Sequence, residues 1–229
     1  SALGIESLPQ TLLFDGAGGI RYHFVGSIKD ASSQGLMQAI QGLLKEEGSS
    51  HQAKSEVARV FGWIKPFTLT HSSGRSLDIA SLKGKVWVAD FVFTRCQSVC
   101  PIITKKMKQL QTDFRSDDDV RFVSITVDPK ADTPKRLREY ERDYGVDSRR
   151  WKFLTGDWVD IKKIMIEEFQ VAVPDAPVFH TDKFVLVDQQ LQIRGYYSAN
   201  SSQALQKLRK HMSELLKSSS TVGLGHSGT

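Results

Sequence analysis

The chain has 229 residues, of which 40% are hydrophobic and 25% are charged, and its formal net charge is +5. This composition is typical of a globular protein with one large or two small domains. The sequence contains no run of about 18 apolar residues and no signal-peptide pattern at Ser1, so we expect the numbering to begin after a removed signal or membrane anchor. Basic and acidic residues alternate in Lys135–Asp143, which predicts a solvated helix face and not a nucleic-acid surface.

Residues 1–47 are predicted to form a strand, a hairpin partner and a helix. The stretches Leu12–Asp15, Gly18–Tyr22 and Ser32–Leu36 are similar, in the same order, to three later stretches: Val185–Asp188, Leu191–Gly195 and Ser201–Leu205. One interpretation is a repeated unit, with the first copy lacking the half that would carry cysteines; the alternative is that any strand, turn, strand and helix looks similar. Because so short a unit is marginal alone, we expect it to pack on the second domain or to end a truncated one. Residues 48–65 are predicted as a linker.

Residues 66–217 are predicted to form the main domain. Alternating strands and helices with a closing hairpin indicate an α/β fold, a mixed sheet flanked by helices. The predicted strands are Phe67–Thr70, Val86–Phe93, Val120–Val127, Phe184–Val187 and Gln192–Tyr197, with short segments at Ser76–Ile79 and Trp151–Leu154. The predicted helices are Pro101–Arg115, Thr133–Tyr144, Asp157–Phe169 and Ser202–Leu216. This is the element order of a thioredoxin-like fold with an insertion, and residues 218–229 are predicted as a flexible tail.

Cys96 and Cys100 are the only cysteines, and they lie where the apolar strand pattern gives way to a helix. Pro101 is favoured just inside a helix start because proline has no N–H to leave unpaired. Both sulfurs are therefore expected near a helix N-terminus, where exposed N–H groups and the helix dipole stabilise a thiolate and lower its pKa. Arg95 adds positive charge. This location predicts reactive thiols.

A plain disulfide staple or two buried free thiols is the alternative for this pair. A staple across three residues constrains the unfolded chain little, and a chain of this length buries enough apolar surface to need none. A closed structural zinc site needs four ligands, and only one cysteine pair exists. Cu(I) prefers thiolate, and two thiolates with one imidazole suit a three-coordinate copper site.

His180 is the best candidate for that imidazole. It ends the Pro-rich loop Val173–His180 immediately before a predicted strand, so we expect it at the mouth of the sheet, where α/β proteins place ligands. His51 and His226 lie in polar or Gly/Ser-rich stretches, with no predicted helix or strand to hold the imidazole ring in place. His211 is predicted on the solvent side of the last helix.

Several motifs together carry a family resemblance. They are Phe67–Thr70, Leu82–Lys85, Phe91–Pro101 with its Cys-x-x-x-Cys-Pro, Ser124–Pro129, Asp132–Pro134 and the distant His180. Over about Pro66–Leu216 they resemble the Sco/SenC family of thioredoxin-fold copper proteins. The first segment, more weakly, resembles the tail of a TlpA/ResA-like thioredoxin domain. One departure is Gln97, where many relatives carry proline.

The resemblance implies that Cys96, Cys100 and His180 bind copper, as Cu(I) or Cu(II), and that the protein helps to assemble the copper centre of cytochrome c oxidase. The implied partners are the oxidase subunit that holds copper, or another apo-cuproprotein, and a thiol reductant protein. It also implies a protein of the periplasm or cell envelope, or of the mitochondrial intermembrane space, held by a membrane anchor absent from this sequence. Asp128, in the family's Asp-Pro motif, is expected either to orient a ligand or to cap the turn before Thr133.

Sulfur chemistry leaves a second function open, that of a thiol-disulfide oxidoreductase with Cys96 and Cys100 as the catalytic pair. A thiolate near a helix N-terminus attacks a partner disulfide, and the second sulfur resolves the mixed disulfide. His180 discriminates between the two functions, because a reductase needs only the cysteine pair.

Overall fold

A computed structural model describes residues 10–14, 20–25, 57, 59–171 and 181–222 of the chain. The chain divides into two compact units, Ser1–Glu56 and Val57–Thr229. In the first unit, β1 (Gln10–Phe14) and β2 (Ile20–Val25) pair antiparallel. The helix predicted around residues 32–36 lies outside the described residues, so the proposed repeat stays a prediction.

A mixed sheet of eight strands in the described residues forms the centre of the second unit. The strand order is β3-β10-β9-β6-β7-β8-β4-β5. The three central strands β6, β7 and β8 are parallel, whereas the outer strands pair antiparallel with their neighbours. The bounds are β3 (Gly62–Trp63), β4 (Thr68–His71), β5 (Ser76–Asp78), β6 (Val86–Val92), β7 (Val120–Thr126), β8 (Trp151–Thr155), β9 (Lys183–Val187) and β10 (Gln192–Ser198).

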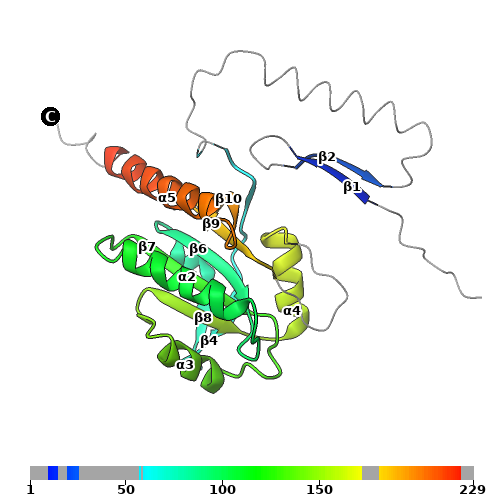
Figure 1. Cartoon of the computed structure of the whole chain (residues 1–229), viewed down its shortest axis with the longest axis vertical. Coiled ribbons are helices and arrows are strands. Elements are labelled where there is room, and N and C mark those ends of the chain that lie inside the picture. The colour runs from blue at the N-terminus through cyan, green and yellow to red at the C-terminus, as the bar shows by residue number, and fades with distance from the viewer. Residues whose placement is uncertain (1–9, 15–19, 26–56, 58, 172–180, 223–229) are drawn as a thin grey trace, which may run out of the picture. The chain divides into compact units, whose positions relative to one another are not determined.

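Three helices cover one face of this sheet. They are α2 (Cys100–Asp113), α3 (Pro134–Asp143) and α5 (Ser202–Val222), and Figure 1 shows α2 in front of the central strands, between the other two. Arg209 on α5 forms an ion pair of 2.7 Å with Asp113 on α2. Thr104 Oγ1 on α2 lies 2.9 Å from the Tyr140 hydroxyl on α3. The predicted thioredoxin-like mixed sheet with flanking helices is therefore confirmed for this unit.

The opposite face is closed by an aromatic cluster around Phe169. This residue follows α4 (Trp158–Lys163) and a π-helical turn, η3 (Ile164–Glu168). Its ring lies 6.1 Å from that of Trp87, 5.2 Å from that of Phe91 and 6.1 Å from that of Phe67, all edge-on. Because side chains alternate along a strand, Trp87 and Phe91 face this cluster while Asp90, between them, faces the three helices.

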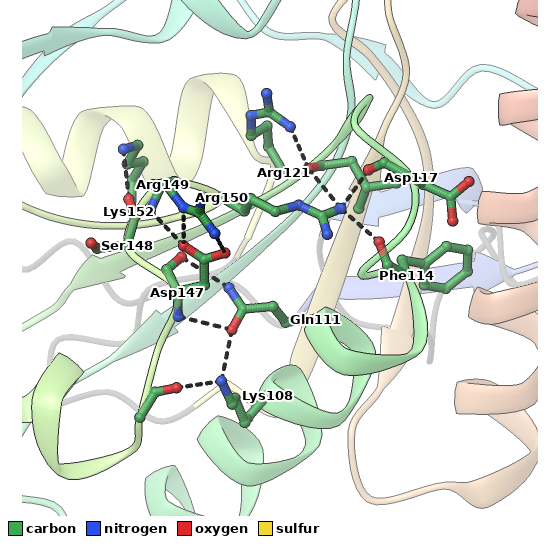
Figure 2. A network of polar contacts seen from close by, with 12 residues as sticks. Lys108, Gln111, Phe114, Asp117, Arg121, Asp147, Ser148, Arg149, Arg150 and Lys152 are labelled. Atoms are coloured by element: carbon green, nitrogen blue, oxygen red, sulfur yellow. Dashed lines mark hydrogen bonds and ion pairs between the residues drawn. The ribbon is translucent and has the colours of Figure 1, made fainter.

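Polar contacts fix the C-terminal half of α2 against the segment that precedes β8 (Figure 2). Gln111 exchanges two hydrogen bonds with the backbone of Asp147, at 3.0 and 3.1 Å. The Arg150 guanidinium donates to the carbonyls of Phe114 and Asp117 at 2.6 and 2.5 Å. These bonds hold α2 at its far end, so that the helix presents its cysteine-bearing start at the C-terminal edge of β6.

The short strand β3 and the 3₁₀-helix η2 (Ile79–Leu82) were not predicted as such, and the helix predicted over 157–169 is instead α4 followed by the π-helical turn η3. The last helix continues to Val222 and so enters the range predicted as a tail. No helix in the described ranges is both long and apolar enough to cross a bilayer.

His211 is buried, which contradicts its predicted place on the solvent side of α5. Its Nδ1 lies 2.6 Å from the Tyr197 hydroxyl. With Leu208 and Leu215, which are also buried, it occupies the helix positions that face the sheet. The hydrogen bond to Tyr197 allows the polar imidazole ring to lie on the apolar face of the helix. Tyr197 is on β10, so the sequence of α5 gives no sign of this bond.

We expect Phe169→Ala to lower the free energy of unfolding by about 3–5 kcal/mol, because it removes a fully buried ring from the aromatic cluster. Ile166→Ala is the matched control, since Ile166 lies in the preceding turn but is 46% exposed, and it should cost about 1 kcal/mol or less. Urea titration followed by far-ultraviolet circular dichroism measures both. Equal losses would show that the cluster does not anchor this face.

Candidate metal centre

The cysteine loop, residues 93–99, connects the end of β6 to the start of α2. Cys96 lies inside it, with its N–H donating to the Phe93 carbonyl at 3.2 Å. Cys100 is the first residue of α2, and Pro101 stands in the first turn as predicted. Both cysteines are free thiols and both are buried. The predicted junction of strand and helix at the cysteines is thus confirmed.

Cys96 has the more acidic thiol. Burial raises its pKa, but hydrogen bonds from the Cys100 and Ser98 backbones and side chains outweigh burial and bring the pKa down to about 7. The Cys100 N–H lies 3.3 Å from Cys96 Sγ, and Ser98 Oγ lies 3.7 Å from it. The Cys100 donor belongs to the N-terminus of α2, where unpaired N–H groups stabilise an anion, and the Ser98 donor belongs to the loop just before it. A large fraction of Cys96 is therefore thiolate near neutral pH.

Cys100 has the opposite character. Burial raises its pKa to about 12, and the hydrogen bond and charge of Cys96 and the charge of Asp90 add to the rise, against a smaller lowering by a backbone bond at Phe93. Cys100 is therefore a protonated thiol at neutral pH. One i, i+4 pair thus contains a nucleophile and a proton-bearing partner.

Asp90 is a buried acid beneath this pair that the sequence did not single out. Its Oδ1 accepts a hydrogen bond of 2.5 Å from Ser124 Oγ, which in turn accepts one of 2.9 Å from Trp151 Nε1. Its Oδ2 has no hydrogen-bond partner among the described residues. Burial raises the Asp90 pKa to about 7, although the Ser124 bond opposes the rise. The one sign of this acid in the sequence is a carboxyl group within the otherwise apolar run of β6. That run by itself predicts only a strand.

Asp132 holds the cysteine loop in position. This carboxylate has no exposure to solvent. It accepts hydrogen bonds from Thr94 N at 3.1 Å, from Thr94 Oγ1 at 2.6 Å and from Thr126 Oγ1 at 2.6 Å. Through Thr94, which lies two residues before Cys96, the loop is thereby tied to Thr126 at the end of β7.

Asp128 makes a second, more exposed tie to the loop. Its carboxylate accepts from Arg95 Nη2 at 2.6 Å and from Nε at 3.1 Å. The cap of α3 is made instead by Thr133, whose hydroxyl accepts from the Arg136 N–H at 3.3 Å. The backbone carbonyl of Asp128 also accepts from the N–H groups of Ala131 and Asp132, at 3.1 and 2.9 Å, and so closes the turn before Thr133. Its side chain contacts Arg95, the residue that precedes Cys96.

His180, the predicted third ligand, lies outside the described residues. Within the described ranges, no group of three or more His, Cys, Asp or Glu side chains gathers to hold a metal. The structure therefore brings two of the three predicted site residues together, on adjacent turns of one segment. The part played by His180 stays a prediction.

The donor set of this pair fits a soft monovalent cation. Thiolate is the ligand that Cu(I) prefers, and Cys96 supplies one without help near neutral pH. Cys100 must lose its proton when a metal binds. The same asymmetry fits disulfide exchange, in which Cys96 attacks and Cys100 resolves.

A family model described as SCO1/SenC matches residues 57–213. The chain belongs to the SCO1/SenC family. The SCO1 protein homolog of Bacillus subtilis is 36% identical over 130 residues, which are 54% of this chain and 67% of that protein. Across three such curated relatives, the match spans 58% to 67% of their length. Because residues 1–56 fall outside the family match, their resemblance to a TlpA/ResA-like segment stays a prediction.

Solved structures of SCO1/SenC proteins share this fold. A SCO1/SenC family lipoprotein from Bacillus anthracis is 36% identical, with a TM-score of 0.63 over 69% of this chain and 97% of that one. BsSco, described as having a disulfide switch and as a member of the Sco family of cytochrome c oxidase assembly proteins, is 30% identical with a TM-score of 0.61, over 68% and 94%. Bradyrhizobium japonicum ScoI, solved with copper bound, is 26% identical with a TM-score of 0.52, over 66% and 99%.

The two thiols should differ in their reaction with iodoacetamide. In Cys100→Ser, which keeps the backbone N–H that bonds Cys96 and a side-chain donor beside it, we expect the alkylation rate to rise with pH through an inflection near pH 7. In Cys96→Ala, Cys100 should react far more slowly throughout neutral pH, because burial keeps it protonated. Mass spectrometry of quenched samples gives both rates. Inflections for both thiols near the ordinary thiol pKa of about 8.5 would contradict the asymmetry.

Proposed function

We propose that this protein is a copper-binding metallochaperone that helps to assemble the copper centre of cytochrome c oxidase, with Cys96, Cys100 and His180 as its ligands. The observation that carries the proposal is the buried pair of free thiols at the start of α2 in a chain of the SCO1/SenC family. Related structures have copper bound or are described as oxidase assembly proteins.

The pair supports reversible binding of Cu(I) because its two sulfurs start from different protonation states. Cys96 offers a thiolate to the incoming ion near neutral pH. Cys100 joins by exchanging its proton for the metal, so binding releases a proton, and returning that proton favours release. A third ligand outside the pair would complete the coordination preferred by a thiolate-bound copper ion, and His180, at the end of the Pro-rich loop before β9, is our candidate. Ligand exchange with a docked apo-protein then transfers the ion.

A second function, thiol-disulfide exchange in the cell envelope, is favoured by the same thiol asymmetry. An acidic attacking thiol followed by a protonated resolving thiol is the arrangement that exchange requires. The two functions use the same sulfurs, so a partner thiol reductant would be needed to keep the pair reduced for copper.

The partners we propose are the copper-holding subunit of the oxidase, or another apo-cuproprotein, and that reductant. We place the protein in the cell envelope, membrane-anchored, or in the mitochondrial intermembrane space if it is eukaryotic. The lipoprotein among its relatives supports this placement.

We expect His180→Ala to lower the affinity for Cu(I) by at least about tenfold. Loss of a residue that only hydrogen-bonds a metal ligand typically lowers metal affinity by about 10- to 100-fold, and loss of a ligand itself should cost at least as much. The reduction potential of the Cys96–Cys100 pair should stay nearly unchanged, since the histidine takes no part in sulfur exchange. Anaerobic titration against a chromophoric Cu(I) chelator measures the affinity, and equilibration with glutathione measures the potential.

His71→Ala is the matched control, because His71 hydrogen-bonds Ser73 in the turn after β4 and should leave copper affinity unchanged. Equal Cu(I) affinities for His180→Ala and the unmodified protein would refute the three-ligand hypothesis. Failure of the unmodified, reduced protein to bind Cu(I) would refute the chaperone proposal itself.

A further inference from the structure

A hollow of about 640 Å³ opens between α2 and α3, beside the cysteine loop. We call it the α2–α3 groove. Its lining includes Thr94 of the loop, Lys105 and Lys108 of α2, and Arg136, Tyr140 and Asp143 of α3. The lining therefore contains three cations and one carboxylate, and none of these residues belongs to the proposed copper ligands.

The positive charge of the groove is only partly compensated. Lys105 is exposed and makes no hydrogen bond or ion pair within the described residues. Lys108 donates to the carbonyl of Gly145 and, at 3.1 Å, to Gln111 Oε1, both uncharged acceptors. Asp143, the lining carboxylate, lies 3.8 Å from Arg142 and is thus shared with a cation outside the groove.

Arg136 joins the groove to the cysteine loop. Its Nε donates at 3.1 Å to Thr94 Oγ1, the hydroxyl that itself donates to the buried Asp132. Glu139 lies 3.4 Å from its Nη1 in an exposed pair, which compensates its charge weakly. The guanidinium is therefore held against Thr94, which lies two residues before Cys96 along the chain.

The other wall of the groove begins one turn after Cys100. Thr104, which is buried at that position on α2, lies 2.9 Å from the hydroxyl of Tyr140 on α3 and joins the two helices. Lys105 and Lys108 follow directly on the same helix. A protein that brings a disulfide or a pair of metal ligands to Cys96 therefore places its neighbouring residues at the mouth of this groove.

We propose that the α2–α3 groove is an electrostatic docking site that selects partner proteins whose reacting cysteines are flanked by acidic side chains. This inference rests on the proposed function, because it concerns partners of the same cysteine pair. Carboxylates of the partner would pair with Lys105, Lys108 and the free edge of Arg136, and complementary charge raises the rate of encounter more than the final affinity. A partner with basic flanks would be repelled.

The groove can be tested through disulfide exchange, which uses Cys96 and needs no metal. The Cys96 thiolate attacks one sulfur of a partner disulfide, forming a mixed disulfide and releasing one partner thiolate. Cys100 then gives its proton to solvent, and its sulfur attacks Cys96 Sγ and displaces the second partner thiolate. The Cys96–Cys100 pair is oxidised by two electrons, and the partner disulfide is reduced by two.

The probes are two cyclic peptide disulfides of identical length, Asp-Asp-Cys-Ser-Ser-Cys-Asp-Asp and Lys-Lys-Cys-Ser-Ser-Cys-Lys-Lys, mixed with the reduced protein. Acid-quenched samples are separated by reversed-phase chromatography to give each initial rate. The test variant is Lys105→Glu, because this exposed side chain has no partner to lose. The matched control is Lys83→Glu, which reverses the same charge at a different place. Lys83 precedes the start of β6, whereas the cysteine loop follows the end of that strand.

At low ionic strength we expect Lys105→Glu to slow the acidic peptide by roughly three- to tenfold and to speed the basic one, since charges near a site steer charged ligands. Lys83→Glu should change neither rate by more than about twofold, and all differences should vanish at about 1 M salt, where the Debye length is about 3 Å. Lys105→Glu/Lys108→Glu should enlarge the effect, with melting temperatures confirming that each variant is folded.

Equal effects of Lys105→Glu and Lys83→Glu on the two peptides would overturn the docking inference. Such a result would leave the proposed function standing if the protein still binds Cu(I). Conversely, failure to bind Cu(I) would refute the proposed function without altering the charge selectivity of the thiols. The two failures are therefore distinguishable.

Discussion

The buried carboxylate of Asp132 fixes the position of the whole site. Three donors surround it, two from Thr94 and one from Thr126, so the chain that leaves β6 is held against the end of β7 before it turns into α2. Without solvent around it, this charge must keep its donors, because an unpaired buried charge is costly. The constraint places Cys96 under the N–H groups of the first turn of α2, and it also fixes Arg136 at the edge of the α2–α3 groove.

The difference between the two thiols follows from that placement. Cys96 receives hydrogen bonds at a helix start, whereas Cys100, within the helix, is turned toward the interior and toward Asp90. A pair of equivalent thiolates would repel each other, and a pair of equivalent thiols would neither attack a disulfide nor capture a metal quickly. The observed pair has one member ready to react and one that holds a proton until a metal or a mixed disulfide replaces it. Copper binding and disulfide exchange are thus two uses of one electrostatic arrangement, and an incoming partner's charge can be sensed at the neighbouring groove.

Much of this could be predicted from the sequence, because its strongest signals are local. The apolar run ending at Phe93, the cysteine spacing and Pro101 predicted the junction of β6 and α2, which the structure confirms. Long-range partners were not predictable: Asp90 in an apolar run gives no sign of Ser124, and His211 was misplaced because its Tyr197 partner lies on β10. The strand β3 is too short to show a period. His180 is linked to the cysteines by its place before a predicted strand and by family resemblance, but by no local pattern, because some eighty residues separate them. Its position is outside the described ranges.

The central claim is that one copper ion is held by Cys96, Cys100 and His180 together. X-ray absorption spectroscopy at the copper edge, on reduced protein loaded with one equivalent of Cu(I), tests it most directly. We expect two sulfur scatterers and one imidazole nitrogen per copper, with the imidazole signal absent in His180→Ala. A single sulfur per copper, or an imidazole signal that persists in that variant, would contradict it.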